Sequence, residues 1–82
     1  MNKVPVGKVT DYLREWCELR KVKRDTEKDE ERYLGFTAMR ENSGEALVLR
    51  TERFVGEDGF VNIDVKEGDA WEWMDAIAIY PA

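Results

Sequence analysis

Residues 61–65, Val-Asn-Ile-Asp-Val, alternate apolar and polar side chains, which is the pattern of a β-strand with one buried face. The three apolar residues fall on one face of such a strand, and Asn62 and Asp64 fall on the other. Turn-forming residues lie on both sides, Gly-Glu-Asp-Gly at 56–59 and Glu-Gly at 67–68. The sequence therefore predicts a half-buried strand between two turns.

The neighbouring segments share this period of two. A strand is predicted for 33–40 (YLGFTAMR), a turn for 41–44 (ENSG), a second strand for 46–54 (ALVLRTERF) and a last strand for 71–80 (WEWMDAIAIY). Short connections favour antiparallel pairing of consecutive strands. Residues 33–80 are thus expected to form a four-stranded antiparallel meander. Gly35 inside a strand predicts a bulge or a close approach of the helix.

The region before Tyr33 has a helical pattern instead. Apolar residues recur there at spacings of three and four, and they are Val9, Tyr12, Leu13, Trp16 and Leu19. Thr10 is a suitable N-cap, and the basic residues from Arg20 to Arg24 suit a helix C-terminus. We expect a helix over 10–24 that packs Leu13, Trp16 and Leu19 against the sheet.

The segments on either side of this helix are assigned from composition. Residues 1–9 contain Pro5 and Gly7 and are expected to be an extended lead-in. Residues 25–32 are expected to be a polar loop, since none of residues 25–31 is apolar. The whole chain, 1–82, is one α+β domain in this interpretation. Residues 16–23 also alternate well enough to be a strand, and a small all-β barrel is the alternative fold.

Composition excludes several kinds of chemistry. The 82 residues include no histidine and one cysteine, which excludes His-based triads, imidazole zinc sites and an internal disulfide. Cys17, beside Trp16, is expected to be an inert buried thiol. Asp58, Asn62 and Asp64 do not have the spacing of a calcium loop. No residue is assigned a catalytic, cofactor-binding or metal-binding role, and the chain is not expected to be an enzyme.

Charge is distributed unevenly along the chain. Residues 1–40 carry ten basic and eight acidic side chains, whereas residues 41–82 carry three basic and ten acidic, and the net charge of the whole chain is −5. This acidic balance opposes attraction to nucleic acid or anionic membrane and favours a basic protein partner. No apolar run approaches the ~18 residues of a membrane span. A lone cysteine favours a cytoplasmic location.

Trp71 and Trp73 are the most informative pair of residues. Spaced by two on a strand, both indoles point the same way and could form a stacking platform or the apolar centre of an interface. Alternatively, they pack beneath the helix against Trp16. They share a face with Ile77 and Ile79 unless Asp75 marks a bulge that changes the register.

The acidic C-terminal half, together with its aromatic residues, is the candidate binding surface. The partner-binding residues predicted there are Glu57, Asp58, Phe60, Asp64, Glu67, Asp69, Trp71, Glu72 and Trp73. The alternative interpretation of these charges is a solvated face that opposes aggregation.

These observations predict a non-catalytic protein–protein interaction module. It would act as an inhibitor or regulator that presents an acidic sheet to a larger basic protein, such as one that itself binds nucleic acid. The alternative function is a binder of small ligands or single-stranded nucleic acid that uses aromatic residues of the sheet. Direct nucleic-acid binding is disfavoured by the carboxylates around the tryptophans. A homodimer through a free sheet edge stays open as an alternative.

Overall fold

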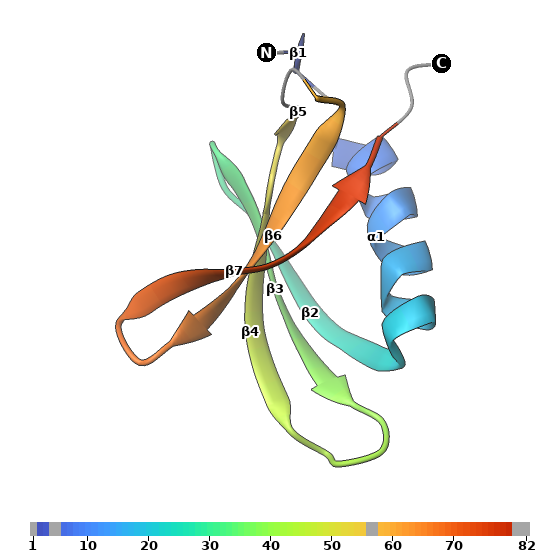
Figure 1. Cartoon of the computed structure of the whole chain (residues 1–82), viewed down its shortest axis with the longest axis vertical. Coiled ribbons are helices and arrows are strands. Elements are labelled where there is room, and N and C mark those ends of the chain that lie inside the picture. Colours follow the sequence, from blue (N-terminus) through green and yellow to red (C-terminus); the bar gives the residue numbers. More distant parts are fainter. Residues whose placement is uncertain (1, 4–5, 56–57, 80–82) are drawn as a thin grey trace.

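One helix lies across one face of a five-stranded antiparallel sheet in the computed structural model, which describes residues 2–3, 6–55 and 58–79 (Figure 1). The helix is α1 (Val6–Arg20), and the strands of this sheet are β2 (Val22–Asp29), β3 (Tyr33–Arg40), β4 (Ala46–Glu52), β6 (Phe60–Glu67) and β7 (Ala70–Ala78). A separate two-stranded pair joins β1 (Asn2–Lys3) to β5 (Phe54–Val55).

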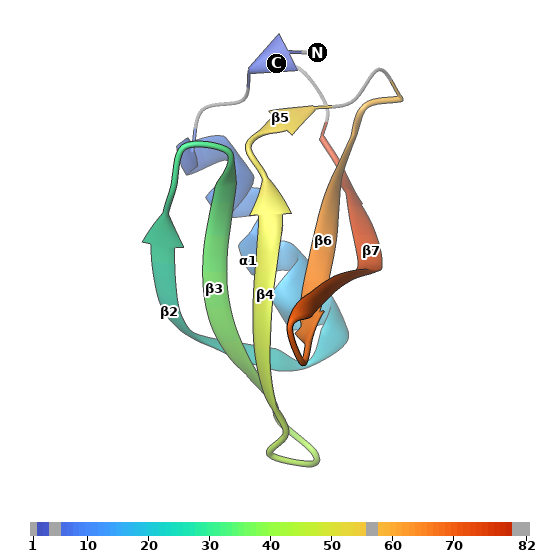
Figure 2. The same cartoon turned by 90° about the vertical axis from the view of Figure 1, so that its left-hand side faces the viewer.

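The strands of the main sheet lie in the order β2-β3-β4-β6-β7, so sequential strands are neighbours, as in a meander (Figure 2). The α+β class and the antiparallel meander are therefore confirmed, whereas the predicted count of four strands is wrong. The fifth strand is β2, which replaces most of the polar loop predicted for 25–32. It is an edge strand rich in charged residues, with its register shifted between Arg24 and Thr26. Charged side chains are typical of such edges.

The helix begins and ends four residues earlier than the predicted 10–24. Residues 6–9 are helical rather than extended, and Val9 is buried in the core. A proline immediately before a helix, as Pro5 stands in the sequence, is compatible with a helix start. At the other end, Lys21 adopts a left-handed backbone conformation with φ of 53°, which turns the chain out of the helix and into β2.

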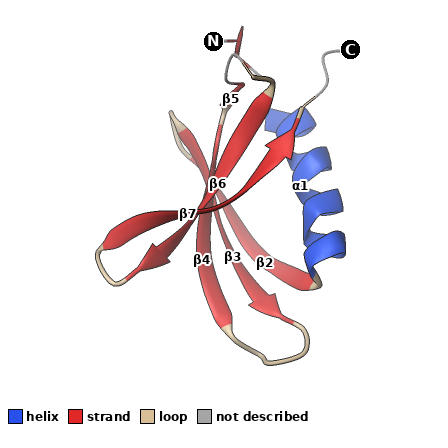
Figure 3. Ribbon diagram, in the orientation of Figure 1, coloured by secondary structure: helices blue, strands red, loops and turns tan. Residues whose placement is uncertain are grey.

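Helix α1 covers one side of the sheet, and the core lies between the two layers (Figure 3). Val9, Leu13, Trp16 and Cys17 are the buried side chains of the helix. The expected packing of Leu19 is wrong, because 73% of this residue is exposed. Leu19 lies at the margin of the apolar stripe in the last turn, and the C-terminal end of the stripe is instead taken by Arg20, which bonds Asp75.

A β-bulge in β7 decides where the tryptophans point. Asp75 pairs with Ile63 whereas Trp73 pairs with Asp64, which leaves Met74 as an extra residue between them. The bulge reverses the alternation of side chains along the strand. Ile77 and Asp75 therefore face α1, and Trp71 and Trp73 face away from it. The packing of the tryptophans beneath the helix against Trp16 is not observed, and neither is the all-β barrel, because residues 16–20 are helical and the sheet is open.

Candidate functional site

The face of the sheet opposite α1, called the open face below, gathers exposed apolar side chains. Among the described residues, five large apolar side chains are exposed, and all but Leu19 belong to this face: Met39, Val48, Phe60 and Trp73. Each pairs across strands with other residues of the open face, such as Met39 with Ala46 and Phe60 with Ala78. The four come from four strands and are not contiguous, since Arg50 and Asp64 separate Val48 from Trp73 in the strand register.

A stack of three side chains from three strands stands on the open face. The guanidinium carbon of Arg50 in β4 lies 4.1 Å from the centre of the Tyr33 ring and 4.3 Å from that of Trp71. Arg50 Nε also donates to Asp64 Oδ2 at 3.0 Å. The cation is thus held between two ring faces and neutralised by a carboxylate, which fixes both rings in place.

The indole of Trp73 is held in place although 64% of the residue is exposed. Its Nε1 donates to Asn62 Oδ1 at 2.9 Å, and Asn62 Nδ2 donates in turn to Glu52 Oε2 at 3.4 Å. These bonds link β7 to β6 and β4. A large aromatic side chain that is already ordered loses less entropy when a partner covers it.

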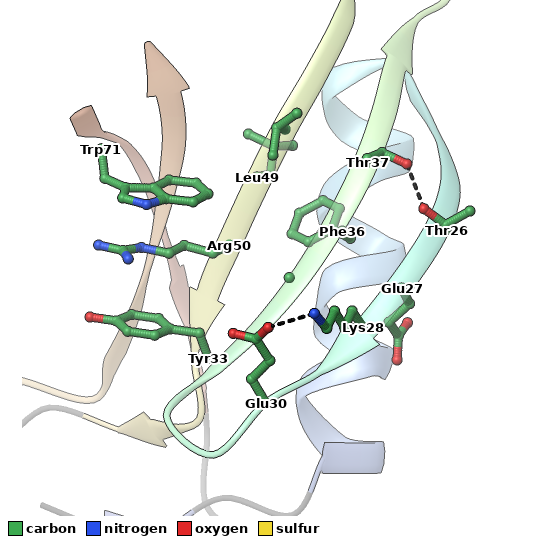
Figure 4. A pocket seen from close by; sticks show the side chains of 12 residues that line it. Thr26, Glu27, Lys28, Glu30, Tyr33, Phe36, Thr37, Leu49, Arg50 and Trp71 are labelled. Carbon is green, nitrogen blue, oxygen red and sulfur yellow. Dashed lines mark hydrogen bonds and ion pairs between the residues drawn. The ribbon is translucent and has the colours of Figure 1, made fainter. Parts of the chain in front are cut away.

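A groove of about 540 Å³ lies beside the stack, over β2, β3 and β4 (Figure 4). Tyr33, Arg50 and Trp71 form one wall, and the hydroxyls of Thr26 and Thr37, 2.7 Å apart, form another. Gly35 lies between Lys28 and Arg50 in the strand register, so its missing side chain opens the floor. Gly35 marks neither a shift in the β3 register nor an approach of the helix, contrary to the sequence interpretation.

The predicted acidic residues are distributed over two ends of β6. Glu67, Asp69 and Glu72 are exposed on the β6–β7 hairpin, whereas Asp58 precedes β6 and bonds the backbone N–H of Phe60 at its other end. A strand of eight residues separates these ends by about 23 Å. Asp64 lies midway with its charge compensated by Arg50. Glu57 lies outside the described residues.

The structure therefore brings Trp71 and Trp73 together with Glu67, Asp69 and Glu72 on one projecting hairpin, and it places Asp58 and Phe60 apart from them. Sequence reasoning assigned no role to Tyr33 or Arg50, and it considered Gly35 and Asn62 only for other roles, a bulge or helix approach and a calcium loop. Alternation alone places Tyr33, Gly35 and Arg50 on the polar faces of their strands. These residues are neighbours because of the register in which the strands pair, and the alternation of residues within one strand does not determine that register.

The remaining features of chemical interest lie elsewhere. Cys17 is buried, and burial raises the pKa of its thiol, against a smaller lowering by the nearby charge of Arg24. Within residues 2–3, 6–55 and 58–79, no three His, Cys, Asp or Glu residues are grouped so that they could hold a metal ion. No helix in the described part of the chain is long and apolar enough to cross a membrane.

Comparison of the chain with models of protein families, with curated proteins and with solved structures finds no match. The functional argument therefore rests on the open face and its hairpin.

Proposed function

We propose that this chain is a non-catalytic protein-binding module that inhibits or regulates a larger basic protein by covering part of its surface. The β6–β7 hairpin and the adjoining open face form the contact surface. The observation that carries the proposal is the hairpin itself, which presents two indoles on the side of the sheet away from α1 and carries three exposed carboxylates. Asp69 lies in the turn, whereas Glu72, opposite Val65, and Glu67 alternate with the indole face and point to the other side of the hairpin. In Figure 1 this hairpin projects from the sheet on the side opposite the helix.

The carboxylates of the hairpin are available for a partner. Glu67, Asp69 and Glu72 are exposed, and no ion pair is recorded for them with any described residue. By contrast, Asp64 and Asp75 are each paired with an arginine. The hairpin also carries one exposed lysine, Lys66, opposite Trp71, so its charged side chains leave a net negative charge. A net charge on a projecting element steers association with an oppositely charged surface and accelerates it.

The aromatic residues supply the part of the contact that charge does not. Exposed carboxylates at the rim of an interface add little affinity in salt, whereas a buried tryptophan at its centre can account for about 2 kcal/mol or more. Trp73 is exposed and held by Asn62, so it is ready to be buried by a partner. The indole face also attracts the lysine and arginine side chains that a basic partner offers.

The first test is a charge reversal on the hairpin. A partner is first captured from lysate on the immobilised parent chain and identified by mass spectrometry. Asp69→Lys combined with Glu72→Lys should then slow association with this partner and reduce its dependence on ionic strength, measured by surface plasmon resonance between about 50 and 300 mM salt. Trp73→Ala should instead speed dissociation. Both variants should remain folded, because these side chains are exposed.

The matched control carries the same change in charge on the opposite side of the molecule. Glu15→Lys with Glu18→Lys alters two exposed carboxylates of α1. The control should leave the association rate closer to that of the parent than the hairpin variant does. Equal effects of the two double variants would show that only net charge matters, and an unchanged affinity in the folded hairpin variant would reject the proposed surface.

A second candidate function is suggested by the open-face aromatic residues Tyr33, Trp71 and Trp73, which could stack on the bases of single-stranded nucleic acid or on a small planar ligand. The hairpin carboxylates oppose the approach of phosphates. An electrophoretic shift with a single-stranded oligonucleotide separates the two functions. A shift that is lost in Trp73→Ala and strengthened in the hairpin charge reversal would favour the nucleic-acid function.

A further inference from the structure

Neither the backbone conformation nor the packing at position 35 requires a glycine. It lies within β3 without a positive φ, and a Cβ added there would meet no heavy atom closer than Lys28 O at 3.7 Å. Glycine weakens a strand relative to residues that bear a side chain. The structural effect of glycine at position 35 is therefore to keep the groove open, because any side chain there would fill the floor of the groove.

The charged side chains that line the groove are all paired within the chain, and the exposed Lys66, opposite Trp71, lies outside the lining. Lys28 Nζ lies 3.1 Å from Glu30 Oε1, Arg50 bonds Asp64, and Glu27 Oε2 lies 2.9 Å from Arg24 Nη1. A charged group entering the groove would lose hydration without finding an unpaired charge of opposite sign. An apolar group would cover Val48 and the ring edges of Tyr33 and Trp71 without this loss.

The groove continues into the acidic hairpin. Trp71 forms part of the groove wall and stands between Asp69 and Glu72 in the sequence. A single partner segment that passes over Trp71 and around the tip of the hairpin can contact both features, with its basic side chains on Asp69 in the turn and on Glu67 and Glu72 of the other side, and a neighbouring side chain over Gly35. The volume of about 540 Å³ is within the range of ligand pockets, ~300–1,000 Å³, and is ample for one large side chain.

We infer that the groove over Gly35 accepts an uncharged apolar side chain, aliphatic or aromatic, from a basic segment of the protein partner. This inference rests on the proposed function and adds to it the anchor residue of the partner. Binding would place the apolar anchor against Val48 and the Tyr33–Arg50–Trp71 stack, while lysine or arginine residues next to the anchor contact the hairpin carboxylates.

The test uses dye-labelled hexapeptides of sequence Lys-Arg-X-Lys-Arg-Lys, in which X is Phe, Leu, Ser or Glu. Dissociation constants are measured by fluorescence anisotropy with the full chain. We expect the parent protein to bind the Phe and Leu peptides at least tenfold more tightly than the Ser and Glu peptides. Chemical shifts of the Gly35 amide and the Trp71 indole N–H should move with the Phe peptide and far less with the Ser peptide.

Gly35→Val is the decisive variant, with Gly35→Ala as a graded intermediate. The dissociation constants of Gly35→Val for the four peptides should lie within about twofold of one another. Each should be close to the weak, salt-sensitive dissociation constant of the parent protein for the Ser peptide. Its stability to urea should equal or exceed that of the parent, because valine favours a strand, and this excludes unfolding as the cause. The hairpin variant with Asp69→Lys and Glu72→Lys should weaken binding of the Phe, Leu and Ser peptides by a similar factor and keep the preference for an apolar X.

The two claims fail separately. A parent protein without preference among the peptides, or an unchanged preference in Gly35→Val, would overturn the groove inference alone. Insensitivity of all peptides to salt and to the hairpin charge reversal would overturn the proposed function. If light scattering shows a dimer of the parent that Gly35→Val abolishes, a second copy of the chain occupies the groove and the inference is wrong.

Discussion

Trp16 Nε1 donates a hydrogen bond of 2.9 Å to Asp75 Oδ2, across 59 positions of sequence. The same oxygen accepts bonds from Arg20 Nε and Nη2 at 3.0 and 2.6 Å. One carboxylate, turned toward the helix by the bulge before it, therefore joins the second half of α1 to the last strand. This bond also satisfies the indole N–H of a tryptophan that is otherwise buried.

Asp75→Asn should reduce stability at neutral pH by about 1–3 kcal/mol, because the carboxylate accepts several hydrogen bonds. Burial raises the pKa of Asp75, but hydrogen bonds from Trp16, Ala76 and Arg20 and the charge of Arg20 outweigh it, so the pKa is lowered overall. Because its pKa is lower in the folded state, the Asp75 carboxylate stabilises the protein at pH values above its unfolded pKa of about 3.9, and this stabilisation is lost as the pH falls through the folded pKa. Urea denaturation at pH 7 and pH 3 checks this. A variant as stable as the parent at pH 7 would contradict it.

Trp16→Ala should lower the free energy of unfolding by about 3–5 kcal/mol, because the side chain is buried in the core and anchors Asp75. Leu19→Ala is the matched control on the same helix, and its effect should stay within about 0.5 kcal/mol because Leu19 is exposed. Denaturant midpoints of the two variants provide the comparison. A similar loss of unfolding free energy in both variants would show that burial does not determine how much a side chain of this helix contributes to stability.

Thr51→Val should increase stability by about 1 kcal/mol. Thr51 is fully buried in β4, and its hydroxyl has no hydrogen-bond partner among the described residues. Replacing an unsatisfied hydroxyl by a methyl group removes a desolvation cost. Thr37→Val, which removes a hydroxyl bonded to Thr26, should give no comparable gain. Thermal unfolding of the three proteins tests this, and a lower midpoint for Thr51→Val would indicate that the hydroxyl is satisfied in solution.

Lys21→Gly should also stabilise the chain, by about 0.5–1 kcal/mol, because Lys21 occupies a left-handed backbone conformation that glycine adopts without strain. Lys21→Val should destabilise it, since a branched side chain is strained there. Equilibrium denaturation distinguishes the two. Equal stabilities would show that the turn between α1 and β2 tolerates any residue.

Cys17 should react slowly with thiol reagents in the folded protein, since it is buried and burial raises its pKa. The labelling rate at pH 7.5 should increase severalfold in denaturing urea, and Cys17→Ser should reduce stability without changing partner binding. Fast labelling without denaturant would show that the thiol is accessible.

The sequence predicted those elements whose residues reveal a buried face. The alternation at 33–40 and around Ile63 gave the correct strands, because one face of each is buried in the core. β2 was missed because Val22 is the only residue from 22 to 28 that is buried, and an edge strand of charged residues has the composition of a loop. The helix boundaries were misplaced because the basic residues after Arg20 resemble a helix end, whereas the backbone turns at Lys21.

The candidate surface was predictable in part for the same reason. Trp71 and Trp73 share a face by spacing alone, and the conditional prediction of a bulge at Asp75 is confirmed within one residue. The stack of Arg50 between Tyr33 and Trp71 could not be predicted, because it depends on the register of β4 against its neighbours. The groove could not be predicted either, since it arises from a missing side chain among residues of three strands.

The extra residue at Met74 also has a consequence for how β7 tolerates substitution. It separates β7 into a segment constrained by packing under the helix and a segment whose alternate side chains, at Trp71 and Trp73, face solvent. Substitutions in the outer segment are therefore expected to cost the core little, whereas substitutions in the inner segment are expected to weaken its packing. The character of the open face and the stability of the domain can therefore be varied separately within a single strand.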